Sequence, residues 1–297
     1  MSPKVSVLVP TYNRSAYLAK ALNSILSQTY SDFEIIITDN CSLDDTEAVV
    51  ASFSDDRIKY LRNEYNVGAV GNYNKALRVA KGEFIHLFSD DDIMADIDNL
   101  AFKVDILERY PNIGLVHSTI MTIDSNDKIV GGTWVVEDRN WNPIAKQDLL
   151  LGTQAYEILY NGWNFITMST VMIRRSILVS NRIEFNNQLR YLIDWAMWLQ
   201  ISLFADFYYI DKPLVYYRRH NNNETNLMNG SILYAEILAM KISMLTLFPD
   251  KVEGLDIKKT LKGINKQLGE QDGLFGLLKK IKLFSIKIKN IAKYCLS

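Results

Sequence analysis

The stretch Phe84-Ile-His-Leu-Phe-Ser-Asp-Asp-Asp92 joins a short apolar run to three consecutive carboxylates. An uninterrupted apolar run of this length is typical of a buried parallel strand. Adjacent carboxylates repel one another unless a cation compensates them, and Mg²⁺ or Mn²⁺ binds such oxygens while substrate phosphates complete its coordination. The stretch therefore predicts a divalent-metal site at the end of a strand, with a solvated acidic turn as the alternative.

Three further apolar runs precede this one, and helical patterns separate them. The expected strands are residues 5–9, 34–38, 58–61 and 84–88, and the expected helices are residues 15–28, 43–53 and 69–80. In the first helix the apolar side chains recur at helical spacing. Strands that alternate with helices of this length predict an α/β fold with a parallel, doubly wound sheet.

Polar side chains follow each of these four strands. In an open α/β sheet, ligands bind beyond the carboxyl ends of the strands. The residues expected there are Pro10, Thr11, Tyr12, Asn13 and Arg14, then Asp39 and Asn40, then Asn63, Asn66 and Gly68, and finally Asp90, Asp91 and Asp92. Their convergence predicts a site for a polar ligand that carries a ring, hydroxyl groups and negative charge.

The pattern becomes more mixed after about residue 112. The expected strands are residues 113–123, 129–136, 164–174 and 206–217, and the expected helices are residues 151–160, 188–203 and 229 to the end. We interpret residues 113–225 as a substrate-shaping region packed on the same sheet. A soft domain boundary is expected near residue 225, after the three asparagines at 221–223.

The composition excludes several classes of protein. Among 297 residues, 33 Lys and Arg against 34 Asp and Glu give a net charge of −1, whereas a duplex-DNA-binding protein usually has a basic excess. The two cysteines, Cys41 and Cys295, provide no framework for structural zinc or disulfides. No glycine-rich phosphate loop follows the first strand, so bound phosphates are expected to depend on a metal. Neither a signal peptide nor a transmembrane helix is predicted, which favours the cytoplasm.

Two single residues in the second half add candidates. Asp194 lies among apolar residues, where a carboxylate has a raised pKa and is a better general base near neutral pH; a helix-start aspartate exposed to water is the alternative. His220 follows a strand and could ligate a metal or contact phosphate, although a lone exposed histidine more often does neither. The remaining histidines, His86 and His117, lie inside strands and are predicted to be packing residues.

The ordered series of motifs resembles glycosyltransferase family 2 over roughly residues 4–220. The matching segments are Val5-Ser-Val-Leu-Val-Pro-Thr-Tyr-Asn-Arg14, Glu34-Ile-Ile-Ile-Thr-Asp39-Asn40-Cys-Ser42, Asn66-Val-Gly68 with Asn74, residues 82–85, and Ser89-Asp-Asp-Asp92. The resemblance implies the GT-A fold, inversion of configuration at the transferred sugar, and dependence on Mn²⁺ or Mg²⁺.

The resemblance also implies roles for individual residues. Tyr12 offers a ring face to the nucleotide base, Asp39 accepts a hydrogen bond from a uracil imide, and Asp194 is the general base. The implied nucleotide-binding set is Pro10, Thr11, Tyr12, Asn13, Arg14, Asp39, Asn66, Gly68, Asn74 and Asp90. The implied metal set is Asp91, with Asp92 supporting the metal or meeting the donor sugar and His220 completing the phosphate or metal site.

Three positions depart from the family pattern. Asn40 stands in place of a second aspartate, Tyr73 in place of an arginine that often precedes Asn74, and Ile193 in place of a glutamate before Asp194. The last two departures leave the identity of the donor sugar undetermined. The register of the acidic run leaves undetermined which aspartate binds the metal.

The resemblance implies transfer from a nucleotide sugar, with UDP favoured, to a glycan or lipid-linked acceptor in surface polysaccharide synthesis. Residues 1–225 would form the catalytic domain, with 1–112 as the nucleotide-sugar-binding half, and residues 226–297 a helical extension. Residues 274–296 hold six lysines and no acid, which predicts a basic amphipathic helix for peripheral membrane contact, for packing on the catalytic domain or for a homo-oligomer. The alternatives are a nucleotidyltransferase and a non-catalytic sugar-binding module.

Overall fold

The computed structural model describes residues 2–134, 148–221, 223 and 230–248. The chain divides into two compact units, Met1–Asn187 with Ile193–Asn223, and Gln188–Leu192 with Glu224–Ser297. The first unit contains the central sheet, and the described part of the second contains helix α8. The predicted boundary near residue 225 and the division at residue 112 stay predictions.

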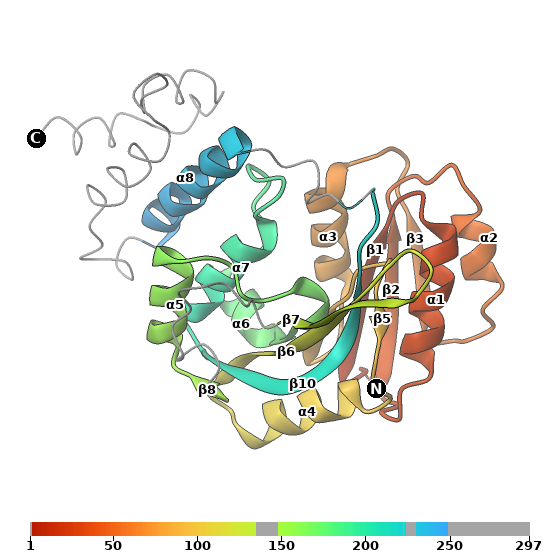
Figure 1. Ribbon diagram of the computed structural model, residues 1–297, viewed down its shortest axis with the longest axis horizontal. Coiled ribbons are helices and arrows are strands. Elements are labelled where there is room, and N and C mark those ends of the chain that lie inside the picture. Colours follow the sequence, from red (N-terminus) through yellow and green to blue (C-terminus); the bar gives the residue numbers. More distant parts are fainter. Residues whose placement is uncertain (1, 135–147, 222, 224–229, 249–297) are drawn as a thin grey trace, which may run out of the picture. The chain divides into compact units, whose positions relative to one another are not determined.

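The elements follow the predicted alternation over the first 100 residues (Figure 1). The strands are β1 (Val5–Thr11), β2 (Phe33–Asp39), β3 (Ile58–Arg62), β4 (Phe84–Leu87), β5 (Ile93–Met94), β6 (Ile113–Ile123), β7 (Ile129–Trp134), β8 (Leu149–Leu150), β9 (Met172–Arg174) and β10 (Asp206–Arg218). The helices are α1 (Ser15–Leu26), α2 (Thr46–Ala51), α3 (Gly68–Val79), α4 (Asn99–Arg109), α5 (Gly152–Asn161), α6 (Arg175–Asn181), α7 (Ile193–Ser202) and α8 (Gly230–Leu247), with a 3₁₀ turn η2 at Met168–Thr170.

Within the described residues the strands form one ten-stranded sheet. Its order is β3-β2-β1-β4-β9-β6-β10-β5, with β7 paired to β6 and β8 paired to β10. The pairs among β1, β2, β3 and β4 are parallel, as is β6 with β10, whereas β9 is antiparallel to both β4 and β6. The carboxyl ends of β1, β2, β3 and β4 therefore share one edge of the sheet, as expected of an α/β fold with a mostly parallel sheet.

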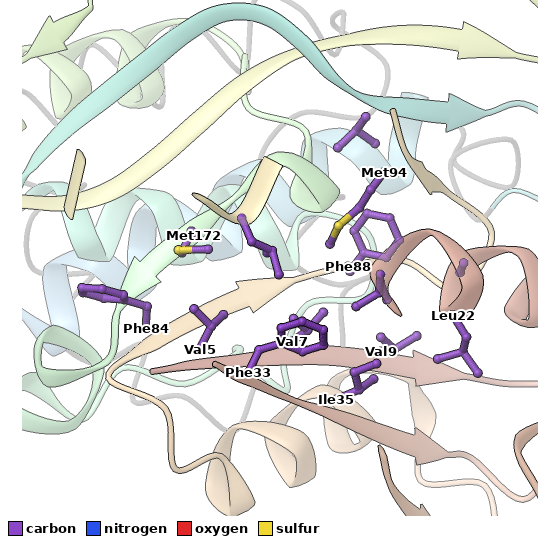
Figure 2. Close-up of a cluster of buried hydrophobic side chains, with 14 of the residues drawn as sticks. Val5, Val7, Val9, Leu22, Phe33, Ile35, Phe84, Phe88, Met94 and Met172 are labelled. Carbon is purple, nitrogen blue, oxygen red and sulfur yellow. The ribbon is translucent and has the colours of Figure 1, made fainter. Parts of the chain in front are cut away.

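One face of the parallel strands packs against α1. Successive side chains of a strand point to opposite faces, so Val5, Val7 and Val9 share a face with Phe33 and Ile35 of β2, where all five are buried (Figure 2). Leu18, Leu22 and Ile25 of α1 are fully buried in the same cluster. Helix α3 lies on the opposite side of these strands from α1 and α2 (Figure 1). These layers hold the strand ends rigidly enough to carry a site.

The predicted strand at residues 164–174 is wrong over most of its length. Only Met172–Arg174 forms a strand, because the preceding residues 168–170 turn as η2. The predicted helix at 188–203 begins only at Ile193. Within the second unit, the backbone N–H groups of Arg190, Tyr191 and Leu192 instead donate to the carboxylate of Glu236, at 2.8, 2.8 and 2.9 Å. Helix α4 and the short strand β5 were not predicted.

The predicted amphipathic tail at residues 274–296 falls outside the described residues. None of the helices in the described ranges combines the length and the apolar character that a membrane span requires.

Candidate active site

The ends of β1 and β2 lie side by side and shape a loop around residue 42. Thr11 and Asp39 are register partners, and the Asn40 N–H donates to the Thr11 carbonyl at 2.9 Å. Asn13 has a left-handed backbone (φ 52°), its N–H donates to the Ser42 hydroxyl at 2.9 Å, and its side-chain oxygen accepts from the Leu43 N–H at 2.7 Å. The predicted residues of the first two strand ends are therefore neighbours.

The buried carboxylate of Asp39 organises this loop. Its Oδ1 accepts from the backbone N–H and the hydroxyl of Ser42, at 2.9 and 2.5 Å, and its Oδ2 accepts from the Tyr60 hydroxyl at 2.6 Å. Oδ1 therefore already has two donors from the protein, whereas the single hydrogen bond to Oδ2 leaves that oxygen room for a second donor. The predicted contact of Asp39 with a uracil base stays a prediction.

Side-chain amides connect the ends of β2 and β3 to the start of α3. The Asn40 side chain donates to Asn66 Oδ1 at 2.8 Å and accepts from the Val67 N–H at 2.8 Å, and Asn66 Oδ1 also accepts from the Gly68 N–H at 2.9 Å. Gly68 has a φ of +76°, which side-chain-bearing residues rarely adopt, so this turn requires glycine. These contacts give Asn66 and Gly68 a structural role, and their contact with a nucleotide stays a prediction.

Asn74 connects α3 to a distant segment of the first unit. Its amide donates to the Phe185 carbonyl at 2.9 Å, and its oxygen accepts from the Phe185 N–H at 2.9 Å. This pair of hydrogen bonds resembles the pairing between two strands, and it fixes residue 185 beside α3. The structure thus shows Asn74 as a positioning residue, and the predicted nucleotide contact is untested.

Arg14 and His220 meet the acidic run after β4. Arg14 Nη1 lies 3.2 Å from Asp90 Oδ1 and 2.5 Å from Asp91 Oδ2, and His220 Nε2 lies 3.0 Å from the same Asp91 oxygen. The His220 ring also stacks on Tyr17, with 5.1 Å between centroids. The structure thereby brings together residues that were predicted from separate stretches of the chain, namely Arg14, Asp90, Asp91 and His220. Arg14 supplies the positive charge that compensates the two carboxylates.

Asp90 and Asp91 are both nearly inaccessible to solvent. Burial, and then the neighbouring Asp91 charge, raises the pKa of Asp90 to about 6, while Arg14 opposes the shift. The Asp91 carboxylate faces both Arg14 and His220, and its backbone carbonyl accepts from the Arg218 Nε–H at 2.7 Å. Asp91 is therefore the carboxylate of the run that contacts both Arg14 and His220.

Asp92 points to different partners. Its Oδ2 accepts from the Ser169 hydroxyl at 2.5 Å and its Oδ1 accepts from the Arg218 N–H at 2.9 Å. Burial raises the pKa of Asp92, and the Asp91 charge raises it further. The two oxygens of Asp92 thus connect the segment after β4 to η2 and to β10. Direct contact of Asp92 with a metal or a donor sugar stays a prediction, and this geometry does not favour it.

The fit of these side chains to a divalent cation depends on how many ligands they supply. Among residues 2–134, 148–221, 223 and 230–248, no three His, Cys, Asp or Glu side chains are grouped to hold a metal alone. Asp91 Oδ2 and His220 Nε2 nevertheless form a two-ligand pair, and Mg²⁺ or Mn²⁺ commonly takes few protein ligands while substrate phosphates supply the rest. The pair therefore fits a metal that arrives with a diphosphate.

Asp194 stands in the first turn of α7, half-buried. Its Oδ2 accepts from the Asn164 amide at 2.8 Å and its Oδ1 accepts from the Trp195 N–H at 2.7 Å. Burial raises the pKa of Asp194 from 3.8 to about 6, and these two hydrogen bonds oppose the shift. Asp194 therefore lies at a helix start, as the alternative had it, but it is half-buried rather than exposed, and its role as general base stays a prediction.

Tyr73 connects the acidic run to Asp194. Burial raises the pKa of this half-buried tyrosine, and the charges of Asp90, Asp91 and Asp194 raise it further. Asp90 and Asp91, which follow β4, and Asp194 of α7 therefore all act electrostatically on this one phenol of the first unit. Tyr73 links Asp194 to Asp91 in this way, although 103 positions separate the two in the sequence.

Sequence reasoning missed several residues of this site. Asn164 and Ser169 fell inside the segment that was predicted as a strand, and Arg218 had no predicted role. Nothing local marks them, because each acts on a residue more than 25 positions away. His86 and His117 are buried in the interior of the first unit, which confirms the prediction that they pack in the core.

Comparison with known proteins agrees with this geometry. The family model for glycosyl transferase family 2 matches residues 6–180. A relative from Campylobacter jejuni, described as a GalNAc(5)-diNAcBac-PP-undecaprenol beta-1,3-glucosyltransferase, is 32% identical over 232 residues, 76% of this chain and 68% of the relative. This chain therefore belongs to glycosyl transferase family 2, and it is a glycosyltransferase enzyme.

Two solved structures share the fold. S. aureus TarS 1-349 in complex with UDP-GlcNAc has a TM-score of 0.65 at 20% identity, covering 89% of this chain and 71% of that one. The Pyrobaculum calidifontis mannosyltransferase PcManGT, in complex with GDP-Man and Mn²⁺, has a TM-score of 0.56 at 17% identity, covering 90% and 74%. The likeness confirms the predicted GT-A fold.

Proposed function

We propose that this enzyme transfers a sugar, with inversion, from a UDP-sugar to a hydroxyl group of a lipid-linked glycan during surface polysaccharide synthesis. The observation that carries the proposal is that the charges of Asp91 and Asp194 both act on Tyr73, while His220 Nε2 lies 3.0 Å from Asp91 Oδ2. A pair suited to a metal–diphosphate and a carboxylate suited to proton abstraction lie in one site. Single-displacement glycosyl transfer can use both groups, one to stabilise the leaving diphosphate and one to accept the proton of the acceptor hydroxyl.

Asp194 acts as the general base. With a pKa raised to about 6, it is mostly ionised at neutral pH and still basic enough to accept a proton from an acceptor hydroxyl. The acceptor oxygen then bonds to the anomeric carbon while the bond from that carbon to the diphosphate oxygen breaks, and the electron pair leaves with UDP. Attack opposite to the leaving group inverts the configuration, and no protein nucleophile is needed.

Asp91 and His220 would hold the divalent cation, Mn²⁺ or Mg²⁺. The bound ion supplies positive charge that offsets the charge developing on the leaving diphosphate. Arg14 bonds to both Asp90 and Asp91 and thereby keeps the two carboxylates together, and in the proposed reaction it turns toward phosphate when the ion binds.

The nucleotide and acceptor classes rest on further support. The Tyr12 ring at the end of β1 is 43% exposed and offers a face to a nucleotide base, and UDP-GlcNAc is the ligand named for the TarS complex. The Campylobacter relative is named for an undecaprenol-linked glycan. A lipid-linked acceptor suits a cytoplasmic enzyme at the inner face of the membrane, with the basic residues 274–296 as a candidate contact.

The test is UDP release from a panel of UDP-glucose, UDP-galactose, UDP-GlcNAc, UDP-GalNAc and GDP-mannose, each with Mn²⁺, Mg²⁺ or EDTA. We expect metal-dependent release from one UDP-sugar, lost in Asp91→Ala, and retained donor binding without transfer in Asp194→Ala. UDP binding that ignores metal would overturn the role of Asp91. Pyrophosphate formation from UTP and a sugar phosphate would indicate a nucleotidyltransferase instead, and no metal-dependent nucleotide binding at all would indicate a non-catalytic module.

A further inference from the structure

Trp163 is an exposed indole directly beside the partner of the proposed base. Its side chain is 51% exposed, one of the most exposed large aromatic groups of the first unit. The next residue, Asn164, donates its amide to Asp194 at 2.8 Å. The exposed indole leaves a large ring face open to water next to the residue that bonds to Asp194, and such a face can stack on a ligand.

A buried second indole fixes the position of Trp163. The rings of Trp163 and Trp195 lie 6.1 Å apart between centroids at an interplanar angle of 34°. Trp195 is 2% exposed, and its Nε1–H donates to the Leu159 carbonyl at 2.9 Å, so it cannot shift without breaking a buried hydrogen bond. Trp163 therefore packs on a rigid support, and the rest of its surface is available to solvent.

The polar neighbours are fixed in the same way. Asn164 Oδ1 accepts from the Ile166 N–H at 3.1 Å, which sets the orientation of the amide and directs its NH₂ group toward Asp194. Trp195 follows Asp194 in α7, and its N–H donates to that carboxylate at 2.7 Å. The two indoles and the base thus form one connected cluster, which we call the Trp163 platform (Trp163, Asn164, Asp194 and Trp195).

We propose that the Trp163 platform binds a pyranose ring of the acceptor glycan, by stacking of the sugar's C–H face on Trp163. This inference rests on the proposed function, because it takes Asp194 to be the base that meets the acceptor hydroxyl. One face of a pyranose presents polarised C–H bonds, which match the negative face of an aromatic ring, while its hydroxyl edge can reach a carboxylate.

The platform comes from other elements than the residues proposed for the donor. The residues proposed for the nucleotide and the metal come from the ends of β1, β2 and β4 and from His220 after β10. The platform comes from α7 and the segment that follows α5, and Asp194 is its contact with the reaction. A sugar stacked on Trp163 would present a hydroxyl group to Asp194 from the side away from the diphosphate, as inversion requires.

The test uses the full chain with the donor identified above and undecaprenyl-diphosphate-linked N-acetylglucosamine as the acceptor, beside a panel of methyl pyranosides for direct binding. The variants are Trp163→Ala and Trp163→Phe. The matched control is Tyr110→Ala. Tyr110 is also exposed (44%), and its ring pairs with a second aromatic ring, that of Tyr208. It comes just before β6, at the amino-terminal end of that strand and away from the carboxyl ends that carry the site. Saturation-transfer NMR reports pyranoside binding without any need for catalysis.

We expect Trp163→Ala to raise the acceptor KM or the pyranoside Kd by about tenfold, Trp163→Phe to restore most of the loss, and Tyr110→Ala to change neither. Tyr110→Ala should also keep the UDP affinity and the donor hydrolysis of the wild type. An unchanged acceptor KM in folded Trp163→Ala, or no pyranoside signal with the wild type at millimolar concentration, would overturn the platform. If Trp163→Ala lost only its binding to vesicles of anionic phospholipid, Trp163 would be a membrane contact and the Trp163 platform would be overturned.

The two proposals can fail separately. If no nucleotide sugar is bound or hydrolysed, the proposed function fails, while a pyranoside signal that disappears in Trp163→Ala would still establish the sugar site. If donor hydrolysis proceeds normally and Trp163→Ala behaves as the wild type with every sugar, only the platform fails.

Discussion

His220 Nε2 lies 3.0 Å from Asp91 Oδ2, although the two residues are 129 positions apart. The contact joins the end of β10 to the end of β4, which are separated in the sheet by β9 and β6. A second ring, that of Tyr17 in α1, stacks on the imidazole and fixes its plane. The pair is therefore built from three elements, and each prediction below probes one part of the site around it.

Replacing His220 by alanine should remove one of two protein ligands of the cation. We expect the Mn²⁺ concentration needed for half-maximal UDP binding to rise by about tenfold or more. Isothermal titration with UDP at several Mn²⁺ concentrations measures this shift. Asp105→Ala on the exposed surface of α4 is the control, and an unchanged metal dependence in His220→Ala would exclude His220 as a ligand.

Arg14 and the cation should compete for Asp91. In Arg14→Gln, Asp90 and Asp91 lose their compensating charge. The free energy of unfolding of the metal-free protein should therefore fall by about 1–3 kcal/mol. Mn²⁺ should then raise the melting temperature of the variant more than that of the wild type. Thermal unfolding with and without Mn²⁺ measures both effects, and equal Mn²⁺ shifts in the two proteins would contradict the competition.

The pH dependence of transfer should follow Asp194. Its pKa is raised to about 6, and only the ionised form accepts a proton, so kcat should rise with pH below about 6 and level off above it. Asp194→Asn should abolish transfer and retain UDP binding. A kcat that stays constant between pH 5 and pH 7.5 (about 1 unit below and 1.5 units above that pKa) would rule out Asp194 as the base.

The same shift predicts an effect on stability. A carboxyl group whose folded pKa is raised stabilises the protein fully below its unfolded pKa of 3.8, and this stabilisation is lost as the pH rises through about 6. Asp194→Asn should therefore be more stable than the wild type at pH 7.5, by about 1–3 kcal/mol, and equal to it near pH 3.5. Urea unfolding at both pH values measures the difference; a constant offset would mean that the charge is not its cause.

Ser169 should hold the acidic run in place through Asp92. Ser169→Ala removes a hydroxyl that donates to Asp92 and also accepts from the Ser89 N–H at 3.1 Å, so we expect about 1–3 kcal/mol of destabilisation and weaker metal-dependent UDP binding. The control is Ser52→Ala, which removes an exposed hydroxyl that donates to a helix carbonyl. Normal stability and binding in Ser169→Ala would show that Arg218 alone suffices to hold Asp92.

Much of the first unit could be predicted from local patterns. The apolar runs of β1, β2 and β4 and the polar residues after them are visible in the sequence because buried parallel strands need apolar side chains on both faces. The same reasoning failed at residues 164–171 and 188–192. There the backbone bonds to distant groups, such as Glu236, and a pattern of neighbours carries no information about such partners.

The sequence by itself determined the α/β fold class, the acidic run after β4 and the candidacy of Asp194 and His220, because strand periodicity and residue chemistry are local properties. Only the tertiary structure decided which carboxylate faces the ligand side. Asp91 meets Arg14 and His220, whereas its neighbour Asp92 is turned to Ser169 and Arg218. It also decided that Trp163 stands beside the base, because that proximity depends on one hydrogen bond between residues 30 positions apart.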